Sequence, residues 1–452
     1  MMLALLASAP AQKRRPDSAA DSTADLVRAA DLLRSGKPDE AEPLLRRVLA
    51  ANPKNADAHN LLGALLDQRG KTAEAEREYR AALGINPRSI SARANLGVLQ
   101  ARTGRGESAI ATFESVLRDA PDHPQATLNV GLLYAARGDY QRAVPFLEKA
   151  RAQQPENLTV LAQLGFTLYQ LKRTDEAAEV LASAASLAPN DPNILYLSGL
   201  VSSLRGDAEA AAAFWQKTLE LRPDFAAANF MIGEELRKQK RYEGAVEFYQ
   251  KALDQDPAQL VFHVRLAGTH MLLSQYDRAL KIFQRAAERF PNSAEAQYFV
   301  GIAARGLGNF ELAESALRKS LAIQDGNVNA LAQLGFVLDQ RGLDTEAEKL
   351  LRRAVATEPR HFYANFDLGR VFVHTKQYER AIAPLMTAEQ IRPRDAAVHY
   401  QLFTVYTRLK RKEDADRELR LFKQFEAESK TSRGDEEQIE DKLPRPPNRE
   451  QP

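Results

Sequence analysis

Apolar residues recur along the chain with the three- and four-residue spacing of amphipathic helices. Leu61, Leu62, Leu65 and Leu66 form one such set, and this spacing places them on one face of a helix. A short turn follows at residues 68–71, where Gly70 interrupts the apolar pattern, and a second helical segment begins after it. The same sequence of helix, turn and helix is repeated along the chain, so the pattern predicts an all-α protein built from helix pairs.

Proline marks the same place in nearly every block. The prolines are evenly spaced, with one place skipped, at Pro53, Pro87, Pro121, Pro155, Pro189, Pro223, Pro257, Pro291, Pro359 and Pro393. The skipped place holds Asp325, and Gly326 follows it. Glycine can end a helix by taking the left-handed conformation, whereas proline ends it by refusing to continue. We therefore expect the register of the repeat to pass through Asp325 unchanged.

Small residues recur with the same period and predict close packing of the two helices. Alanine occupies one place in all twelve blocks: Ala41, Ala75, Ala109, Ala143, Ala177, Ala211, Ala245, Ala279, Ala313, Ala347, Ala381 and Ala415. Glycine stands twelve residues before it in nine blocks: Gly63, Gly97, Gly131, Gly165, Gly199, Gly233, Gly301, Gly335 and Gly369. Each glycine within a helix costs about 1 kcal/mol relative to alanine. Close helix approach offsets that cost, with a large residue such as Phe113 or Leu351 filling the crevice.

These features together resemble the tetratricopeptide repeat family, whose 34-residue helix pairs carry small residues, an aromatic or leucine and a proline at fixed places. The match spans twelve blocks over residues 22–429. The resemblance implies a right-handed α-solenoid superhelix of stacked antiparallel helix pairs, with the first helix of each pair on the concave side.

The two ends of the chain lie outside this array. Residues 1–21 contain a short apolar run and the small residues Ala9 and Ala11, which together are similar to a signal-peptidase site. We interpret the segment either as the remnant of an export signal of a periplasmic or secreted protein, with its start upstream, or as a disordered N-terminus of a cytoplasmic one. Residues 430–452 combine mixed charges with four prolines and predict a disordered tail.

Composition excludes several classes of function. Lys and Arg number 62 against 60 Asp and Glu, a formal charge of +2, which argues against a nucleic-acid partner. Cysteine is absent, which removes disulfides and thiolate metal sites. No stretch approaches the roughly 18 consecutive apolar residues of a membrane helix.

The seven histidines show no metal-binding or catalytic spacing. Every recurrent residue already has a predicted packing role. We therefore predict no catalytic residue, no cofactor, no metal site and no small-molecule substrate.

The first helix of each pair offers the remaining candidate site. Asn95, Asn129 and Gln163 share one place of the repeat, similar to the asparagine ladder of O-linked N-acetylglucosamine transferases, and Gln333, Asp367 and Gln401 share it further on. An amide can donate and accept at once, which suits peptide backbones. Aromatic residues, which are typical of partner surfaces, occupy neighbouring places: Phe166, Tyr169, Tyr196, Phe230, Tyr298, Phe336, Phe366 and Tyr400.

These residues predict a protein-binding scaffold or assembly factor that holds peptide segments or helices in its concave groove. One alternative is a subunit that contributes its repeats to a separately encoded enzyme. A second alternative is an RNA-binding helical repeat, which the near-zero net charge disfavours.

Overall fold

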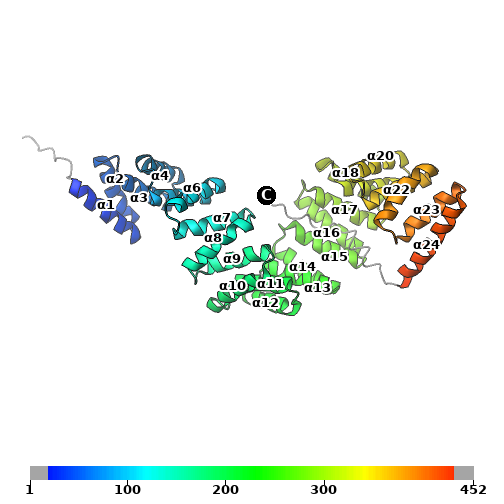
Figure 1. Cartoon of the computed structure of the whole chain (residues 1–452), viewed down its shortest axis with the longest axis horizontal. Coiled ribbons are helices and arrows are strands. Elements are labelled where there is room, and N and C mark those ends of the chain that lie inside the picture. The colour runs from blue at the N-terminus through cyan, green and yellow to red at the C-terminus, as the bar shows by residue number, and fades with distance from the viewer. Residues whose placement is uncertain (1–18, 432–452) are drawn as a thin grey trace, which may run out of the picture. The chain divides into compact units, whose positions relative to one another are not determined.

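The computed structural model describes residues 19–431 and is helical throughout that range, as the repeat pattern predicts. The chain forms two compact units, and the division in the sequence falls between Asp207 and Ala208. We call them unit 1 and unit 2 and treat each by itself (Figure 1). The predicted N-terminal segment 1–21 and tail 430–452 lie almost entirely outside the described residues, so both stay predictions. None of the helices in the described range has the length and apolar character that a membrane crossing requires.

The described residues form 24 helices. Unit 1 contains α1 (Ala19–Arg34), α2 (Pro38–Ala51), α3 (Ala56–Gln68), α4 (Thr72–Ile85), α5 (Ile90–Arg102), α6 (Gly106–Asp119), α7 (Pro124–Ala136), α8 (Tyr140–Gln153), α9 (Leu158–Gln170), α10 (Thr174–Leu187) and α11 (Pro192–Leu204). Unit 2 contains α12 (Ala208–Leu221), α13 (Ala226–Lys238), α14 (Tyr242–Gln255), α15 (Leu260–Leu272), α16 (Tyr276–Arg289), α17 (Ala294–Gly306), α18 (Phe310–Ile323), α19 (Val328–Gln340), α20 (Asp344–Thr357), α21 (Phe362–His374), α22 (Tyr378–Ile391), α23 (Ala396–Arg408) and α24 (Lys412–Thr431).

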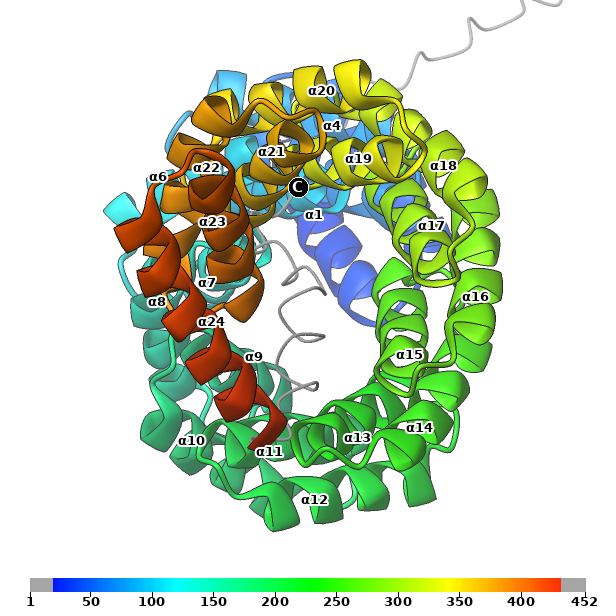
Figure 2. The same cartoon turned by 90° about the vertical axis from the view of Figure 1, so that its right-hand side faces the viewer.

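Successive helices pack as antiparallel pairs, and the first helices of neighbouring pairs also contact each other. In unit 1, α3 contacts α5 and α7 contacts α9; in unit 2, α19 contacts α21 and α21 contacts α23. Figure 2 shows the consequence in unit 2, where α15, α17, α19 and α21 lie on the inner side of α16, α18, α20 and α22. The first helices therefore line the inner face, as the family resemblance implied.

The second helix of each pair ends at the predicted place. The residue that caps it stands directly before the recurrent proline, as Asn52 does before Pro53 and Arg392 before Pro393. At the skipped place, α18 ends in the same way with Gln324 as its C-cap before Asp325. The expectation that the register passes through Asp325 is confirmed. The expected left-handed conformation of Gly326 is not found, since Gly326 is not among the glycines with positive φ.

Side chains cap the start of most first helices. Asn55, Ser89 and Asp191 each accept a hydrogen bond from a backbone N–H in the first turn of the helix that follows. The ring nitrogens of His123 and His361 do the same. These bonds satisfy N–H groups that have no partner within the helix. His123 and His361 therefore act as helix N-caps.

The turn within each pair contains a residue in the left-handed conformation, again once in every repeat. Seven of the twelve are glycines, at Gly36, Gly70, Gly104, Gly138, Gly206, Gly308 and Gly342, and five are not, at Lys172, Lys240, Ser274, Lys376 and Lys410. A bond from the N–H of Lys71 to the carbonyl of Leu66 (2.9 Å) closes the turn after α3. This is the Schellman ending of a helix, which requires positive φ at one residue.

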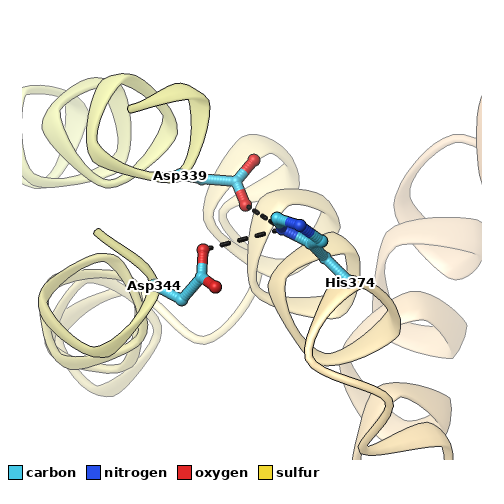
Figure 3. A group of neighbouring side chains, drawn as sticks. All are labelled: Asp339, Asp344 and His374. Atoms are coloured by element: carbon cyan, nitrogen blue, oxygen red, sulfur yellow. Dashed lines mark ion pairs between the residues drawn. The ribbon is translucent and has the colours of Figure 1, made fainter. Parts of the chain in front are cut away.

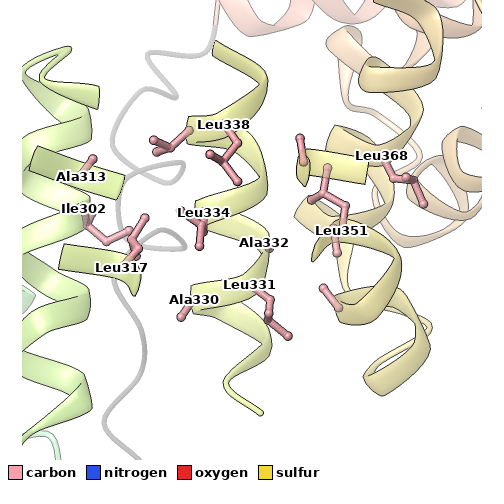
Figure 4. Close-up of a cluster of buried hydrophobic side chains, with 14 of the residues drawn as sticks. Ile302, Ala313, Leu317, Ala330, Leu331, Ala332, Leu334, Leu338, Leu351 and Leu368 are labelled. Carbon is pink, nitrogen blue, oxygen red and sulfur yellow. The ribbon is translucent and has the colours of Figure 1, made fainter. Parts of the chain in front are cut away.

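The core of each unit consists of clusters of small and large apolar side chains between the two helix layers. In unit 2 it surrounds α19, where Ala330, Leu331, Leu334 and Leu338 meet Leu317 and Leu351 from the neighbouring second helices (Figure 4). The recurrent glycines lie against the large residues of the crevice, since a Cβ on Gly97 would lie 2.8 Å from Phe113. The predicted packing of small against large residues is confirmed at the eight helical sites Gly63, Gly97, Gly131, Gly165, Gly233, Gly301, Gly335 and Gly369.

Candidate functional site

The residues predicted to bind a peptide all lie on first helices. In unit 1, the structure places Asn95 on α5, Asn129 on α7, Gln163, Phe166 and Tyr169 on α9, and Tyr196 on α11, all of them half-buried. In unit 2, it places Phe230 on α13, Tyr298 on α17, Gln333 and Phe336 on α19, Phe366 and Asp367 on α21, and Tyr400 and Gln401 on α23.

The asparagines of unit 1 already use part of their hydrogen-bonding capacity. The Nδ2 of Asn95 donates to Oδ1 of Asn60 on the preceding first helix, at 3.0 Å. The Nδ2 of Asn129 donates to the carbonyl of Gln125 within α7, at 2.8 Å. Both side chains are thus oriented by the protein before any ligand arrives, which lowers the entropy lost on binding.

Aromatic residues of α9 form a small cluster in unit 1. The ring of Phe166 lies 6.2 Å from that of Tyr140, edge to face, and 6.4 Å from that of Tyr169. Burial raises the pKa of Tyr169 above its ordinary value. The phenol therefore stays neutral and can serve as a hydrogen-bond donor.

The aromatic residues of unit 2 differ in their accessibility. Tyr298 is only 6% exposed and packs on Phe299, so its role in this conformation is to fill the core. Phe230 is half-buried between Phe262 and Tyr249, with ring centroids 4.9 and 5.6 Å away. Tyr400 is 47% exposed, which leaves the greatest free surface of these side chains. Whether any of them contacts a ligand stays a prediction.

Three predicted residues of unit 2 meet in one cluster, together with three that the sequence analysis did not select. We call it the arginine cluster; it consists of Arg305, Gln333, Phe336, Asp339, Asp367 and Arg370 from α17, α19 and α21. Phe336 lies between the two arginines, and each guanidinium carbon is 5.1 Å from the centre of its ring. Cation–π attraction on both sides fixes the ring.

Hydrogen bonds hold both arginines of the cluster in place. The Nη1 of Arg305 donates to Oε1 of Gln333 at 2.5 Å. Arg370 donates to Asp339 at 2.5 Å and to Asp367 at 3.1 Å. Because three neighbouring helices supply these groups, the cluster links three repeats.

Burial makes Asp367 unusual among these groups. Removal from water raises the pKa of Asp367 to about 7, although the positive charges of Arg370 and Arg305 act to lower it. A carboxyl group with a pKa near neutrality changes its charge in the physiological range. The charge of the cluster is therefore sensitive to pH and to any ligand that excludes more water.

The arginine cluster borders a hollow on the inner face of unit 2, with a volume of about 400 Å³ and a lining of Asp339, Gln340, Arg370, Val373, His374 and Gln401. Guanidinium donors, amide groups and carboxylate acceptors thus face the same space. Gln401 was predicted to line a groove, whereas Arg370 and His374 were not. The charged pair of the cluster is Arg370 and Asp339, which lie on the first helices of adjacent repeats.

Two groups among the described residues bring histidine and carboxylate atoms within 4.8 Å of one another, as a metal site requires. They are Asp339, Asp344 and His374, and Glu389, His399 and Glu418. In the second group His399 Nδ1 is bonded directly to Glu418 at 2.7 Å. The first group lies beside the hollow.

Paired helices stacked in register, with a shared inner face, define an α-helical repeat protein of the solenoid class. Two family models described as tetratricopeptide repeat match the chain, one at residues 134–200 and 236–301, the other at 26–90, 94–158, 205–259 and 339–396. These matches cover more than half of the chain. The chain belongs to the tetratricopeptide repeat family, whose members bind proteins or peptides and are generally non-catalytic scaffolds.

Several solved structures resemble the chain in fold. PilF of Pseudomonas aeruginosa is 22% identical, with 45% of this chain and 93% of that chain covered and a TM-score of 0.41. A chain of the Cut9–Hcn1 hetero-tetramer of the APC/C is 14% identical, with 94% of this chain and 96% of that chain covered and a TM-score of 0.44. Yeast Tom70 is 15% identical, with 93% and 98% covered and a TM-score of 0.41. No curated protein matches the chain.

Proposed function

We propose that this chain is a non-catalytic scaffold that binds extended segments or helices of other proteins on its inner helices. The arginine cluster of unit 2 is the observation that carries the proposal. Phe336 is only half-buried although two arginines flank it. An accessible aromatic ring beside two arginines is the kind of surface found at protein-binding hot spots, where aromatic and arginine residues are enriched.

The chemistry of the cluster suits a peptide. Guanidinium groups donate to backbone carbonyls or to carboxylates, and the face of an aromatic ring accepts an apolar side chain. The hydrogen bonds from Arg305 to Gln333 and from Arg370 to Asp339 hold the donors before binding. A preorganised surface loses less conformational entropy when a partner binds. The exposed ring of Tyr400 on α23 extends the same inner face by one repeat.

A site-specific photocrosslinker tests which face binds. We would place it at Tyr400 on the inner helix α23 and, as a matched control, at Met386 on the second helix α22, since their exposed fractions are 47% and 41%. Mass spectrometry of crosslinks formed in extract of the native organism should identify protein segments joined to position 400 and absent from position 386. Crosslinks predominantly to RNA, or equal yields at both positions, would overturn the proposal.

A second measurement tests the arginine cluster itself. With the peptide identified above, the double variant Arg305→Ala and Arg370→Ala should weaken binding at least tenfold, the effect of losing about 1.4 kcal/mol. The matched control is Arg353→Ala on the second helix α20, where the arginine pairs with Asp325 away from the inner face. Equal affinity of the double variant and the control would remove the cluster from the binding site.

A further inference from the structure

Asp339, Asp344 and His374 converge on one point beside the arginine cluster, although they belong to three different helices. Asp339 lies in the last turn of α19, Asp344 is the first residue of α20, and His374 is the last residue of α21. The Nδ1 atom of His374 lies 3.6 Å from an Oδ1 atom of each aspartate (Figure 3). The two carboxylates therefore approach the same imidazole nitrogen from two sides.

This distance does not correspond to a hydrogen bond. Nitrogen and oxygen atoms in hydrogen bonds lie about 2.7–3.2 Å apart, so 3.6 Å is too long for either carboxylate. Among the described residues, the Oδ1 atoms of Asp339 and Asp344 are both enclosed and lack a hydrogen-bond partner. The side chain of Asp339 is only 6% exposed. An enclosed carboxylate oxygen without a partner is costly, and both such oxygens are aimed at His374.

The other six histidines have assigned roles in the helical framework. His59, His263 and His399 bond through Nε2 to the carbonyl of the proline six residues earlier. His123 and His361 cap helices, and His270 bonds to Gln275. His374 differs from all of these, because its ring is 62% exposed and its Nδ1 faces only carboxylates beyond hydrogen-bond distance.

We propose that Asp339, Asp344 and His374 form a binding site for a divalent transition-metal ion of the Zn²⁺ type. Zinc is bound by imidazole nitrogen and carboxylate oxygen at about 2.0–2.2 Å, usually in a tetrahedron. The ligand atoms of such a tetrahedron lie about 3.3–3.6 Å from each other, from the same bond lengths. The observed 3.6 Å between Nδ1 and each Oδ1 fits this spacing. The positive ion would satisfy both unpartnered oxygens.

The surroundings hold one ligand in the orientation that the site needs. Arg370 donates to Oδ2 of Asp339 at 2.5 Å, and Gln340 donates to the same atom at 3.2 Å. These bonds turn the other oxygen, Oδ1, toward His374. Outer hydrogen bonds of this kind orient metal ligands and affect affinity, so Arg370 is a positioning residue. The three protein ligands leave a coordination position open toward the hollow.

In the second histidine and carboxylate group, both ring nitrogens of the histidine already have hydrogen-bond partners. His399 bonds to Glu418 at 2.7 Å through Nδ1 and to the carbonyl of Pro393 at 2.9 Å through Nε2. Both ring nitrogens are therefore used, and both side chains are 1% exposed. An ion would have to break these bonds, so the proposal is restricted to Asp339, Asp344 and His374.

Calorimetric titration of the full chain with Zn²⁺, without a histidine tag, tests the site. We expect one ion per chain, and His374→Ala, Asp339→Asn and Asp344→Asn should each weaken its binding at least tenfold. His361→Asn is the matched control, because it removes an imidazole from the other end of the same helix and keeps an oxygen to cap α21. Circular dichroism of each variant verifies that the helices are retained.

A spectroscopic readout separates a metal site from a structural ion pair. Bound Co²⁺ in place of Zn²⁺ should give the visible absorption of a four-coordinate ion, and this absorption should be lost in His374→Ala and kept in His361→Asn. Arg370→Ala should weaken Zn²⁺ binding less than His374→Ala does. Undiminished Zn²⁺ affinity in His374→Ala, or the absence of a one-to-one complex in the parent chain, would overturn the proposal. Neither outcome bears on peptide binding.

Discussion

Gly335 of α19 and Leu351 of α20 share a space that holds only one side chain. A Cβ atom on Gly335 would lie 2.5 Å from Cγ of Leu351, closer than real carbon atoms approach, and Leu351 is fully buried. The same relationship recurs in the next repeat, between Gly369 and Leu385. The absence of a Cβ at the glycine leaves room for the large residue of the second helix. The packing of that residue offsets the cost of the glycine to helix stability.

We predict that Gly335→Ala destabilises the protein by about 1–3 kcal/mol, the usual effect of overpacking. Gly326→Ala is the control, because a Cβ there meets nothing within 4 Å. Leu351→Ala alone should cost about 2–5 kcal/mol through the cavity that it leaves. The double variant should cost less than the sum, since the smaller side chain makes room for the new methyl group. Urea unfolding measures all four, and strict additivity would contradict the steric account.

Substitutions at the left-handed turn position should change stability in opposite directions, depending on whether glycine is introduced or removed. Lys172 is exposed and has φ of 58°, a conformation that suits glycine. The left-handed conformation costs a non-glycine residue about 1–2 kcal/mol, and glycine avoids this cost. Glycine also makes the unfolded chain more flexible, which offsets part of the gain. Lys172→Gly should therefore stabilise unit 1 by about 0.5–1 kcal/mol. Gly70→Ala, at φ of 73° with open space around it, should destabilise by about 1 kcal/mol. The shifts in the urea midpoint should have opposite signs.

Asp367 should make stability fall as pH rises. Its pKa is raised to about 7 by burial, whereas an unfolded aspartate titrates near 3.9. The stability that the neutral carboxyl contributes is fully present below about pH 4 and is lost as pH rises through about 7. The Asp367→Asn variant has no carboxyl group to titrate at this position. The difference in free energy of unfolding between the variant and the parent should therefore shift in favour of the variant by at most about 4 kcal/mol between about pH 4 and about pH 7. A difference that is constant with pH would contradict the prediction.

His399 and Glu418 predict a second pH effect, at the C-terminal pair of helices. Burial lowers the pKa of His399, but its hydrogen bonds to Glu418 and to the Pro393 carbonyl raise it by more, so the net shift is upward. The stability that protonation of His399 contributes is fully present below about pH 6.5, the ordinary histidine pKa, and is lost as pH rises through the raised value.

Glu418→Ala tests this pair, because it leaves a buried imidazolium without its counter-charge and should cost about 3 kcal/mol at pH 6. The cost should be smaller at a pH above the raised pKa of His399, where the imidazole is neutral. His399→Asn is the matched comparison, since Asn365 already bonds to the Pro359 carbonyl (2.9 Å) at the equivalent place. It should retain more stability than His399→Ala in thermal unfolding.

The sequence determined the helix pairs, the register of their repeat and the contact of small with large residues. These features are local or repeat with one period, so the spacing of Gly301, Ala313 and Leu317 already specifies which faces meet. The register even survives at Asp325, because Gln324 ends the helix without proline.

The candidate sites depended on the tertiary structure instead. Asp339, Asp344 and His374 show no metal-binding spacing, since each comes from a different helix and only the stacking of two repeats brings them together. Likewise, burial separates Tyr298 and Asp367 from the more accessible Phe336 and Tyr400, although all four stand on first helices. Periodicity determines which face a side chain occupies, whereas its exposure and partners depend on the exact directions of side chains on neighbouring repeats.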